Sequence, residues 1–169
     1  MRDLILFYDQ IKELTLKQLF NEINRKDYLR VKVKDIKLVD LLYNNRSLLG
    51  VYIFFDEDNN VVYIGKASSR AILERMAGHL DPRPRSFFNN LLCSITSIPK
   101  ALITHEDMDL AYEKMINFNF QFIEFPDHLG CVIEKIEKYL VFHSLELFNK
   151  RRTIIDIDPN MLIKDIPNN

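Results

Sequence analysis

Five side chains in the middle and second half of the sequence carry groups that could do chemistry together. They are two tyrosines, an arginine, a histidine and a glutamate: Tyr52, Tyr63, Arg75, His79 and Glu137. An arginine fork binds phosphate oxygens, a carboxylate can hold a divalent metal, and tyrosine or histidine can transfer a proton. Hydrolysis of a phosphodiester needs such groups around a positioned water. The residue types therefore favour phosphodiester chemistry if the fold brings them together.

Two β-rich runs carry the tyrosines and predict a hairpin. Gly50–Phe55 and Val61–Gly65 flank the polar sequence Asp56–Asn60, which is typical of a solvated turn. Side chains alternate along each strand, so Tyr52 and Tyr63 share a face only with an even loop or with a bulge that restores the phase. Both hydroxyls can serve one phosphate only from a shared face. We therefore predict an even loop or a bulge.

A helix is predicted over 71–80, directly after the hairpin. Four apolar residues recur at helical spacing and form a buried stripe: Ile72, Leu73, Met76 and Leu80. Arg75 and His79 fall together on one flank of this stripe. The pair can therefore act on one substrate.

A long helix, predicted over 127–147, carries the glutamate. Its apolar stripe contains Leu129, Ile133, Ile136 and Leu140. At about 100° per residue, Glu137 lies at the edge of this stripe and Glu134 points nearly opposite, into solvent. A carboxylate at the margin of a packed face can be held rigidly enough to serve as a single metal ligand.

The rest of the sequence alternates short helical and strand-like runs. Thr15 and Gln18 form a capping box, which predicts that the second of two short helices within 5–24 starts there. Further expected elements are a strand over 29–34 with one basic face, helices near 87–95 and 107–117, and a strand around 118–122. Few βαβ units are present, so the predicted class is α+β, a small antiparallel sheet flanked by helices.

The order of the chemical residues resembles the GIY-YIG nuclease family. Gly50-Val51-Tyr52 and Tyr63-Ile64-Gly65 match the tripeptides on the first two strands of that family, and Lys66 and Arg75 follow. Downstream, four residues match its later glutamate, aliphatic pair and asparagine: Glu137, Leu140, Val141 and Asn149. The resemblance covers about residues 48–150. The segment from Tyr63 to Arg75 is slightly longer than in the commonest form of the family.

This resemblance implies a fold and an activity. The fold would be a three-stranded antiparallel sheet flanked by helices over 48–152, preceded by an extension over 1–47 and followed by a tail over 153–169. The activity would be metal-dependent hydrolysis of double-stranded DNA by a stand-alone endonuclease, as in restriction enzymes and small phage-type nucleases. A homodimer is expected if both strands are cut symmetrically.

The resemblance also implies a role for each site residue. Glu137 would be the sole protein ligand of Mg²⁺ or Mn²⁺, and Arg75 would bind the scissile phosphate. Tyr52, or else Tyr63, would be the general base, with its pKa lowered by a cation such as Lys66 or by a metal-bound water, and His79 would hold or relay a proton. Three further residues would support the structure: Gly50, Gly65 and Asn149.

Local charge must supply any DNA contact, because 23 basic and 24 acidic residues give a net charge of −1. Three basic runs provide the candidates: Arg30, Lys32 and Lys34; Arg70, Arg83 and Arg85; and Lys150, Arg151 and Arg152. Each run is also compatible with an ordinary solvated face. The competing functional hypothesis is a catalytically inactive domain that binds nucleic acid or another protein.

Several classes of protein are disfavoured by composition. The apolar runs are shorter than the roughly 20 residues of a membrane span, and Asp9 interrupts the first of them, so neither a membrane segment nor a signal peptide is expected. Cys93 and Cys131 lack the spacing of a zinc site or a disulfide framework. A reduced, cytoplasmic setting is therefore expected.

Overall fold

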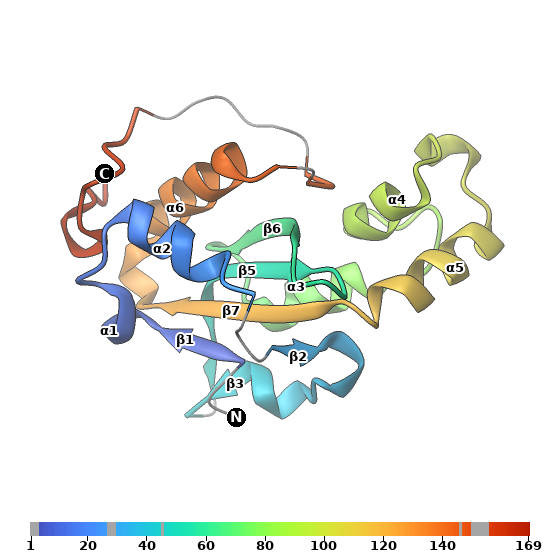
Figure 1. Ribbon diagram of the computed structural model, residues 1–169. Helices are drawn as coiled ribbons and strands as arrows, with labels where there is room; N and C mark the ends of the chain where they lie inside the picture. Colours follow the sequence, from blue (N-terminus) through green and yellow to red (C-terminus); the bar gives the residue numbers. More distant parts are fainter. Residues whose placement is uncertain (1–3, 27–29, 45, 146, 150–155) are drawn as a thin grey trace.

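The computed structural model describes residues 4–26, 30–44, 46–145, 147–149 and 156–169. Within these residues, a mixed sheet of five strands is covered by helices on both faces (Figure 1). The strand order is β1 (Ile5–Phe7), β7 (Asn119–Phe125), β5 (Leu49–Phe55) and β6 (Val61–Ala67), and β2 (Val31–Lys32) also pairs with β7. β1 runs parallel to β7, whereas the other pairs are antiparallel. The α+β class is confirmed, but the sheet is larger than the predicted three-stranded one.

β5 lies at the centre of the sheet and divides the core into two layers. Its alternate side chains face opposite ways: Tyr52 and Phe54 pack on one side, and Val51, Ile53 and Phe55 on the other. The first layer is covered by α3 (Ile72–His79), α4 (Asn90–Thr96) and α5 (His105–Met115). The second layer is covered by α2 (Leu16–Ile23) and α6 (Gly130–His143). Figure 1 shows α4 and α5 side by side beyond one end of the sheet.

The hairpin of β5 and β6 has an odd loop and a bulge. Phe55 pairs with Val61 across the five-residue loop 56–60, and Phe54 pairs with Tyr63, so Val62 is an extra residue. The bulge restores the phase, and Tyr52 then pairs with Gly65. Paired residues share a face, so both tyrosines lie on the α3 side of the sheet, as predicted.

The N-terminal segment confirms the second predicted helix and corrects the first. Thr15 Oγ1 accepts a hydrogen bond from the Gln18 N–H at 3.1 Å, and Gln18 Oε1 accepts one from the Thr15 N–H at 2.8 Å, which completes the capping box of α2. Before it, β1 precedes the single turn of α1 (Tyr8–Ile11). The predicted basic strand is also shorter, because β2 ends at Lys32 and a 3₁₀ turn follows at Val33–Asp35.

Residues 156–169 pack against the start of α2. The Leu16 N–H donates to the Met161 carbonyl at 3.2 Å, and the Ile163 N–H donates to the Leu14 carbonyl at 2.9 Å. Ile163 is 1% exposed and joins the layer under α6. The end of the described chain therefore belongs to the core of the domain.

The remaining elements are short and peripheral to the sheet. A small hairpin joins β3 (Leu42–Tyr43) to β4 (Arg46–Ser47), and 3₁₀ turns occupy Leu38–Leu41, Lys100–Leu102, Asp127–Leu129 and Ile163–Asp165. Along the described chain, every helix is too short or too polar to cross a membrane.

Candidate active site

Four of the predicted catalytic residues meet in one cavity of about 60 Å³. Tyr52 comes from β5, Tyr63 from β6, and Arg75 and His79 from α3. Four additional residues line the same cavity: Arg70, Glu74, Phe88 and Asn90. The hairpin and the following helix therefore create the site together, as their order in the sequence suggests.

Tyr52, Tyr63 and His79 form a compact cluster in this cavity. The Tyr52 hydroxyl lies 2.9 Å from His79 Nε2, within hydrogen-bond distance. The two tyrosine rings stack with centroids 6.2 Å apart, and the His79 ring lies 5.2 Å from that of Tyr63 at a steep angle. Phe54 packs on all three rings and closes the cluster toward the core.

Two glycines permit this arrangement by their lack of a side chain. The Tyr52 ring lies so close to Gly65 that a Cβ there would collide with the ring and its hydroxyl. A Cβ on Gly50 would collide with the backbone carbonyl of Ile123 on β7. Gly65 therefore allows the Tyr52 ring to pack directly on the backbone of β6, and Gly50 allows close pairing of β5 with β7.

The pKa of Tyr52 moves in the wrong direction for a general base. Burial raises this pKa well above the ordinary value of 10, and the neighbouring Tyr63 and Glu137 raise it further. Arg75, rather than Lys66, is the cation that opposes the shift. Tyr52 is only 3% exposed, whereas Tyr63 is half-buried. Burial and the raised pKa therefore disfavour Tyr52 as the base, and Tyr63 is the more accessible hydroxyl.

His79 is held as a neutral imidazole. Burial, and secondly the charge of Arg75, lower its pKa from 6.5 to about 4. Its Nδ1 is buried and has no hydrogen-bond partner among the described residues. Near neutral pH, one ring nitrogen therefore remains able to accept a proton.

Arg75 supplies a positive charge next to this cluster. Its side chain is half-buried, and its Nε is buried with no hydrogen-bond partner in the described part of the chain. A buried donor left in this state is costly, and an anionic ligand would satisfy it. The arginine is therefore suitably placed to bind a phosphate in the cavity.

Glu137 lies deeper than its predicted position at the edge of a stripe. Its side chain is fully buried, although its charge still acts on the pKa of Tyr52. Val141, one turn later on α6, is also buried, so the buried arc of the helix extends past the glutamate. Wide burial of α6 between the sheet and its neighbours therefore brings the carboxylate inside.

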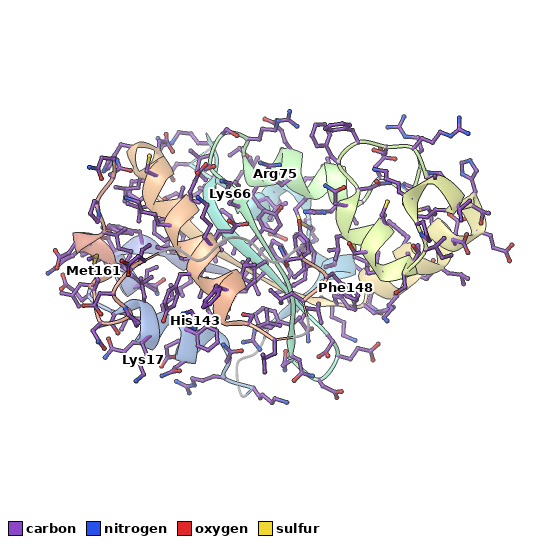
Figure 2. The ribbon with its side chains drawn as sticks, turned by 90° about the horizontal axis from the view of Figure 1, so that it is seen from above. Lys17, Lys66, Arg75, His143, Phe148 and Met161 are labelled. Atoms are coloured by element: carbon purple, nitrogen blue, oxygen red, sulfur yellow. The ribbon has the colours of Figure 1, made fainter. Side chains whose placement is uncertain are left out.

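Lys66 and Glu134 pair with each other instead of taking their predicted places. Lys66 Nζ lies 2.7 Å from Glu134 Oε1. Glu134 is therefore partly exposed but points toward β6, and not away from the sheet as predicted. Figure 2 shows Lys66 and Arg75 near the same end of β6. Strand alternation nevertheless puts Lys66 on the α6 face, opposite to Tyr63. It does not line the cavity.

The predicted metal ligand does not fit a hydrated ion in this arrangement. A carboxylate oxygen suits Mg²⁺, but Mg²⁺ held by one carboxylate keeps several waters around it. Glu137 is fully buried and does not line this cavity, so its carboxylate has no contact with solvent, where such a shell would lie. Among the residues that the structure describes, no group of three His, Cys, Asp or Glu side chains could hold a metal ion.

Asn149 supports the site through the exposed edge of β6. Its Oδ1 accepts a hydrogen bond from the Ile64 N–H at 2.9 Å, and its Nδ2 donates to the Ile64 carbonyl at 2.5 Å. The Phe148 N–H donates to the neighbouring Val62 carbonyl at 2.8 Å. These contacts satisfy backbone groups that an edge strand would otherwise leave open. The structural role predicted for Asn149 thus agrees with its position.

The predicted DNA-binding residues separate into different environments. Arg30 is half-buried; it packs over the Phe55 ring at 3.7 Å and donates to the Ile23 carbonyl at 2.6 Å, so it caps α2. Lys34 donates to Asn117 at 2.9 Å. Lys32 is half-buried on β2.

The other predicted contacts surround the cavity or fall outside the described residues. Arg70 lines the cavity, and Arg83 forms an ion pair with Asp81 at 2.6 Å. Arg85 is exposed. The run of Lys150, Arg151 and Arg152 lies outside the described residues.

Sequence reasoning missed three residues that line the cavity: Glu74, Phe88 and Asn90. Glu74 directly precedes Arg75 on the predicted helix, and nothing in its spacing sets it apart from an ordinary surface charge. Phe88 lies in a stretch of paired aromatic and basic residues, and this composition is the one signal that could have indicated it.

Comparison with known proteins adds no family assignment. No protein-family model matches the chain, and neither a curated protein nor a solved structure matches it.

Proposed function

We propose that this chain is an endonuclease that hydrolyses phosphodiester bonds in double-stranded DNA. One observation carries the proposal: the two tyrosines, Arg75 and His79 converge on one cavity from three elements. The resemblance to GIY-YIG nucleases supports it through the same residues.

Arg75 binds the scissile phosphate in this proposal. Its side chain lines the cavity, and the bidentate fork of an arginine orients a phosphate in a way that lysine cannot reproduce. Arg70 lines the same cavity and adds a second positive charge. The pair stabilises negative charge as it develops on the phosphoryl oxygens.

Tyr63 receives the proton of the attacking water as the water oxygen bonds to phosphorus, and Tyr52 and His79 carry that proton away. The bond from phosphorus to the leaving 3′ oxygen breaks, and this oxygen takes a proton from solvent. The Tyr52 hydroxyl contacts both neighbours, because it interacts with Tyr63 and lies 2.9 Å from His79 Nε2. In the tautomer that leaves Nε2 without a hydrogen, His79 accepts the proton of Tyr52 as Tyr52 accepts that of Tyr63. A phosphate on Arg75 offsets the charge that lowers the pKa of His79, so substrate makes the imidazole a better acceptor.

The alternative is a catalytically inactive domain that binds DNA. Full burial of Glu137 favours this alternative, because a metal-dependent enzyme needs its carboxylate to be accessible. A requirement for Mg²⁺ or Mn²⁺ follows from the resemblance alone. The metal ion is therefore varied in the experiment, and phosphate binding and proton transfer are assigned to protein side chains alone.

Nicking of supercoiled plasmid separates the two functions. The purified chain is incubated with Mg²⁺, with Mn²⁺ and with EDTA, alongside R75A, R75K and Y63F. Arg46 gives the matched arginine control, R46A, because its side chain is 73% exposed and its ion pair with Asp127 is long at 3.9 Å. We expect cleavage by the wild type and R46A, and a loss of at least about 100-fold for R75A and R75K.

The outcomes of this experiment are distinct. Plasmid binding without cleavage in any metal would support the inactive alternative. If R75A still cleaves plasmid at the wild-type rate, Arg75 does not bind the scissile phosphate. Cleavage in EDTA would show that hydrolysis needs no exchangeable metal.

A further inference from the structure

The loop that follows α3 presents an exposed aromatic ring beside the candidate site. Phe87 is 79% exposed, and Phe88 next to it is 42% exposed. Their rings meet edge to face with centroids 5.1 Å apart. The two adjacent rings form an exposed aromatic patch next to the candidate site, and an exposed apolar patch can mark a binding surface.

Hydrogen bonds hold this loop in one shape. Asn89 is fully buried and its Nδ2 donates to the carbonyls of Asp81 and Arg83, at 3.0 and 2.7 Å. The Arg83 guanidinium also binds both carboxylate oxygens of Asp81. The Ser86 N–H donates to the Arg83 carbonyl at 3.0 Å. The loop that carries Phe87 is therefore held by internal hydrogen bonds.

Phe88 connects this loop to the cavity that contains Arg75. It packs so closely on α3 that a Cβ on Gly78 would come within 2.8 Å of it. The Arg70 guanidinium lies over its ring, 4.2 Å from the centroid. Phe88 lines both the candidate active-site cavity and a neighbouring hollow of about 430 Å³, which Phe87 also lines.

The neighbouring hollow combines aromatic and cationic side chains. Arg85 lines it together with Phe87, Phe88 and the ion pair of Arg83 with Asp81. Bases stack on aromatic rings while arginines contact the backbone, and this combination is typical of sites for unpaired nucleotides. One exposed ring is too small for a protein interface, which takes about 800 Å² from each partner.

We propose that Phe87 stacks on a nucleobase that is unpaired next to the scissile phosphate. The inference rests on the proposed nuclease function and specifies its substrate as duplex DNA with an unpaired nucleotide at the cut. In an intact duplex both faces of each base are already stacked. The ring can therefore select DNA that carries a gap, a flap or an extrahelical base.

Fluorescence of 2-aminopurine tests this proposal without cleavage. Two duplexes are titrated with protein in EDTA: one carries 2-aminopurine as a single extrahelical base, and the other carries it paired. The variants are F87A, F87Y and, as a control, F142A on α6, where Phe142 is 47% exposed. Thermal unfolding checks each variant.

We expect quenching of the extrahelical probe by the wild type, F87Y and F142A, and not by F87A. F87A should weaken binding of that duplex roughly tenfold and leave the affinity for the paired duplex unchanged. Equal affinities of the wild type for the two duplexes, equal losses on both, or no DNA binding would overturn the proposal. If the protein quenches only the extrahelical probe but does not nick plasmid, the result supports base stacking by Phe87 and contradicts only the proposed nuclease function.

Discussion

The hydroxyl of Tyr52 lies 2.9 Å from Nε2 of His79, and this contact joins the central strand of the sheet to α3. Both side chains are almost fully buried, at 3% and 4% exposed. The protonation state of the histidine is therefore coupled to the stability of the whole layer between β5 and α3.

Acid should destabilise the protein through His79. Its pKa is about 4 in the folded state and 6.5 when exposed, so the unfolded chain binds more protons between these values. The stabilisation is complete above pH 6.5 and is lost as the pH falls toward 4. The loss amounts to roughly 3 kcal/mol. Urea unfolding at a series of pH values measures it.

The variant H79Q isolates this contribution, since glutamine does not titrate. Its free energy of unfolding should vary less than that of the wild type between pH 6.5 and pH 4. H105Q is the control, because His105 is exposed at the start of α5. An identical pH dependence for the wild type and H79Q would mean that the histidine is not buried as a neutral group.

The two substitutions E137Q and E137A should differ in stability. Glutamine keeps the volume of this fully buried side chain, whereas alanine leaves a cavity and should lower the free energy of unfolding by about 2 kcal/mol or more relative to glutamine. Thermal unfolding measures this difference. E113Q on the exposed surface of α5 is the control.

Plasmid nicking by the same variants tests the function of this carboxylate. Loss of cleavage in E137Q with an unchanged melting temperature would support a chemical role. Equal activity of E137Q and the wild type would leave Glu137 with a structural role only.

Removing the amide of Asn149 should open the edge of β6. N149A leaves the N–H and the carbonyl of Ile64 without their partners, at a cost of roughly 1–3 kcal/mol. Hydrogen exchange at the Ile64 amide should accelerate, and N160A provides a control in an exposed turn. Unchanged protection of Ile64 would show that Asn149 does not hold the edge in solution.

The basic residues of the N-terminal segment should have unequal effects. K32Q and K34Q should each reduce the slope of log affinity against log salt by up to roughly one unit, if each lysine contacts a phosphate. R30Q should instead lower the melting temperature, because Arg30 caps α2 and packs on Phe55. Filter binding at several salt concentrations distinguishes these results. An unchanged slope for both lysines would make this surface an ordinary solvated face.

Local patterns in the sequence predicted the hairpin and α2 well. The polar run between two apolar runs fixed the turn, and the shared face of Tyr52 and Tyr63 followed from strand alternation with a bulge. Thr15 and Gln18 marked the start of α2 because a capping box is made by neighbours in the sequence.

Features created by distant contacts were not predictable in the same way. β1 has only three residues and is a strand because β7 pairs with it, whereas its apolar sequence alone was compatible with a helix. Glu137 appeared to be at a helix margin because the burial of Val141 depends on how α6 packs on the sheet. Arg30 appeared to be free because its carbonyl partner belongs to another element.

The parallel pairing of β1 with β7 has a consequence for folding kinetics. These strands lie at opposite ends of a long stretch of sequence, and Lys164 reaches Glu13 across a separation of 151 residues. Closing such loops costs chain entropy before the contacts form, and folds rich in them are slow, on the order of milliseconds to seconds. We therefore expect the central hairpin to form early in refolding, and the sheet to be completed only when β1 reaches β7.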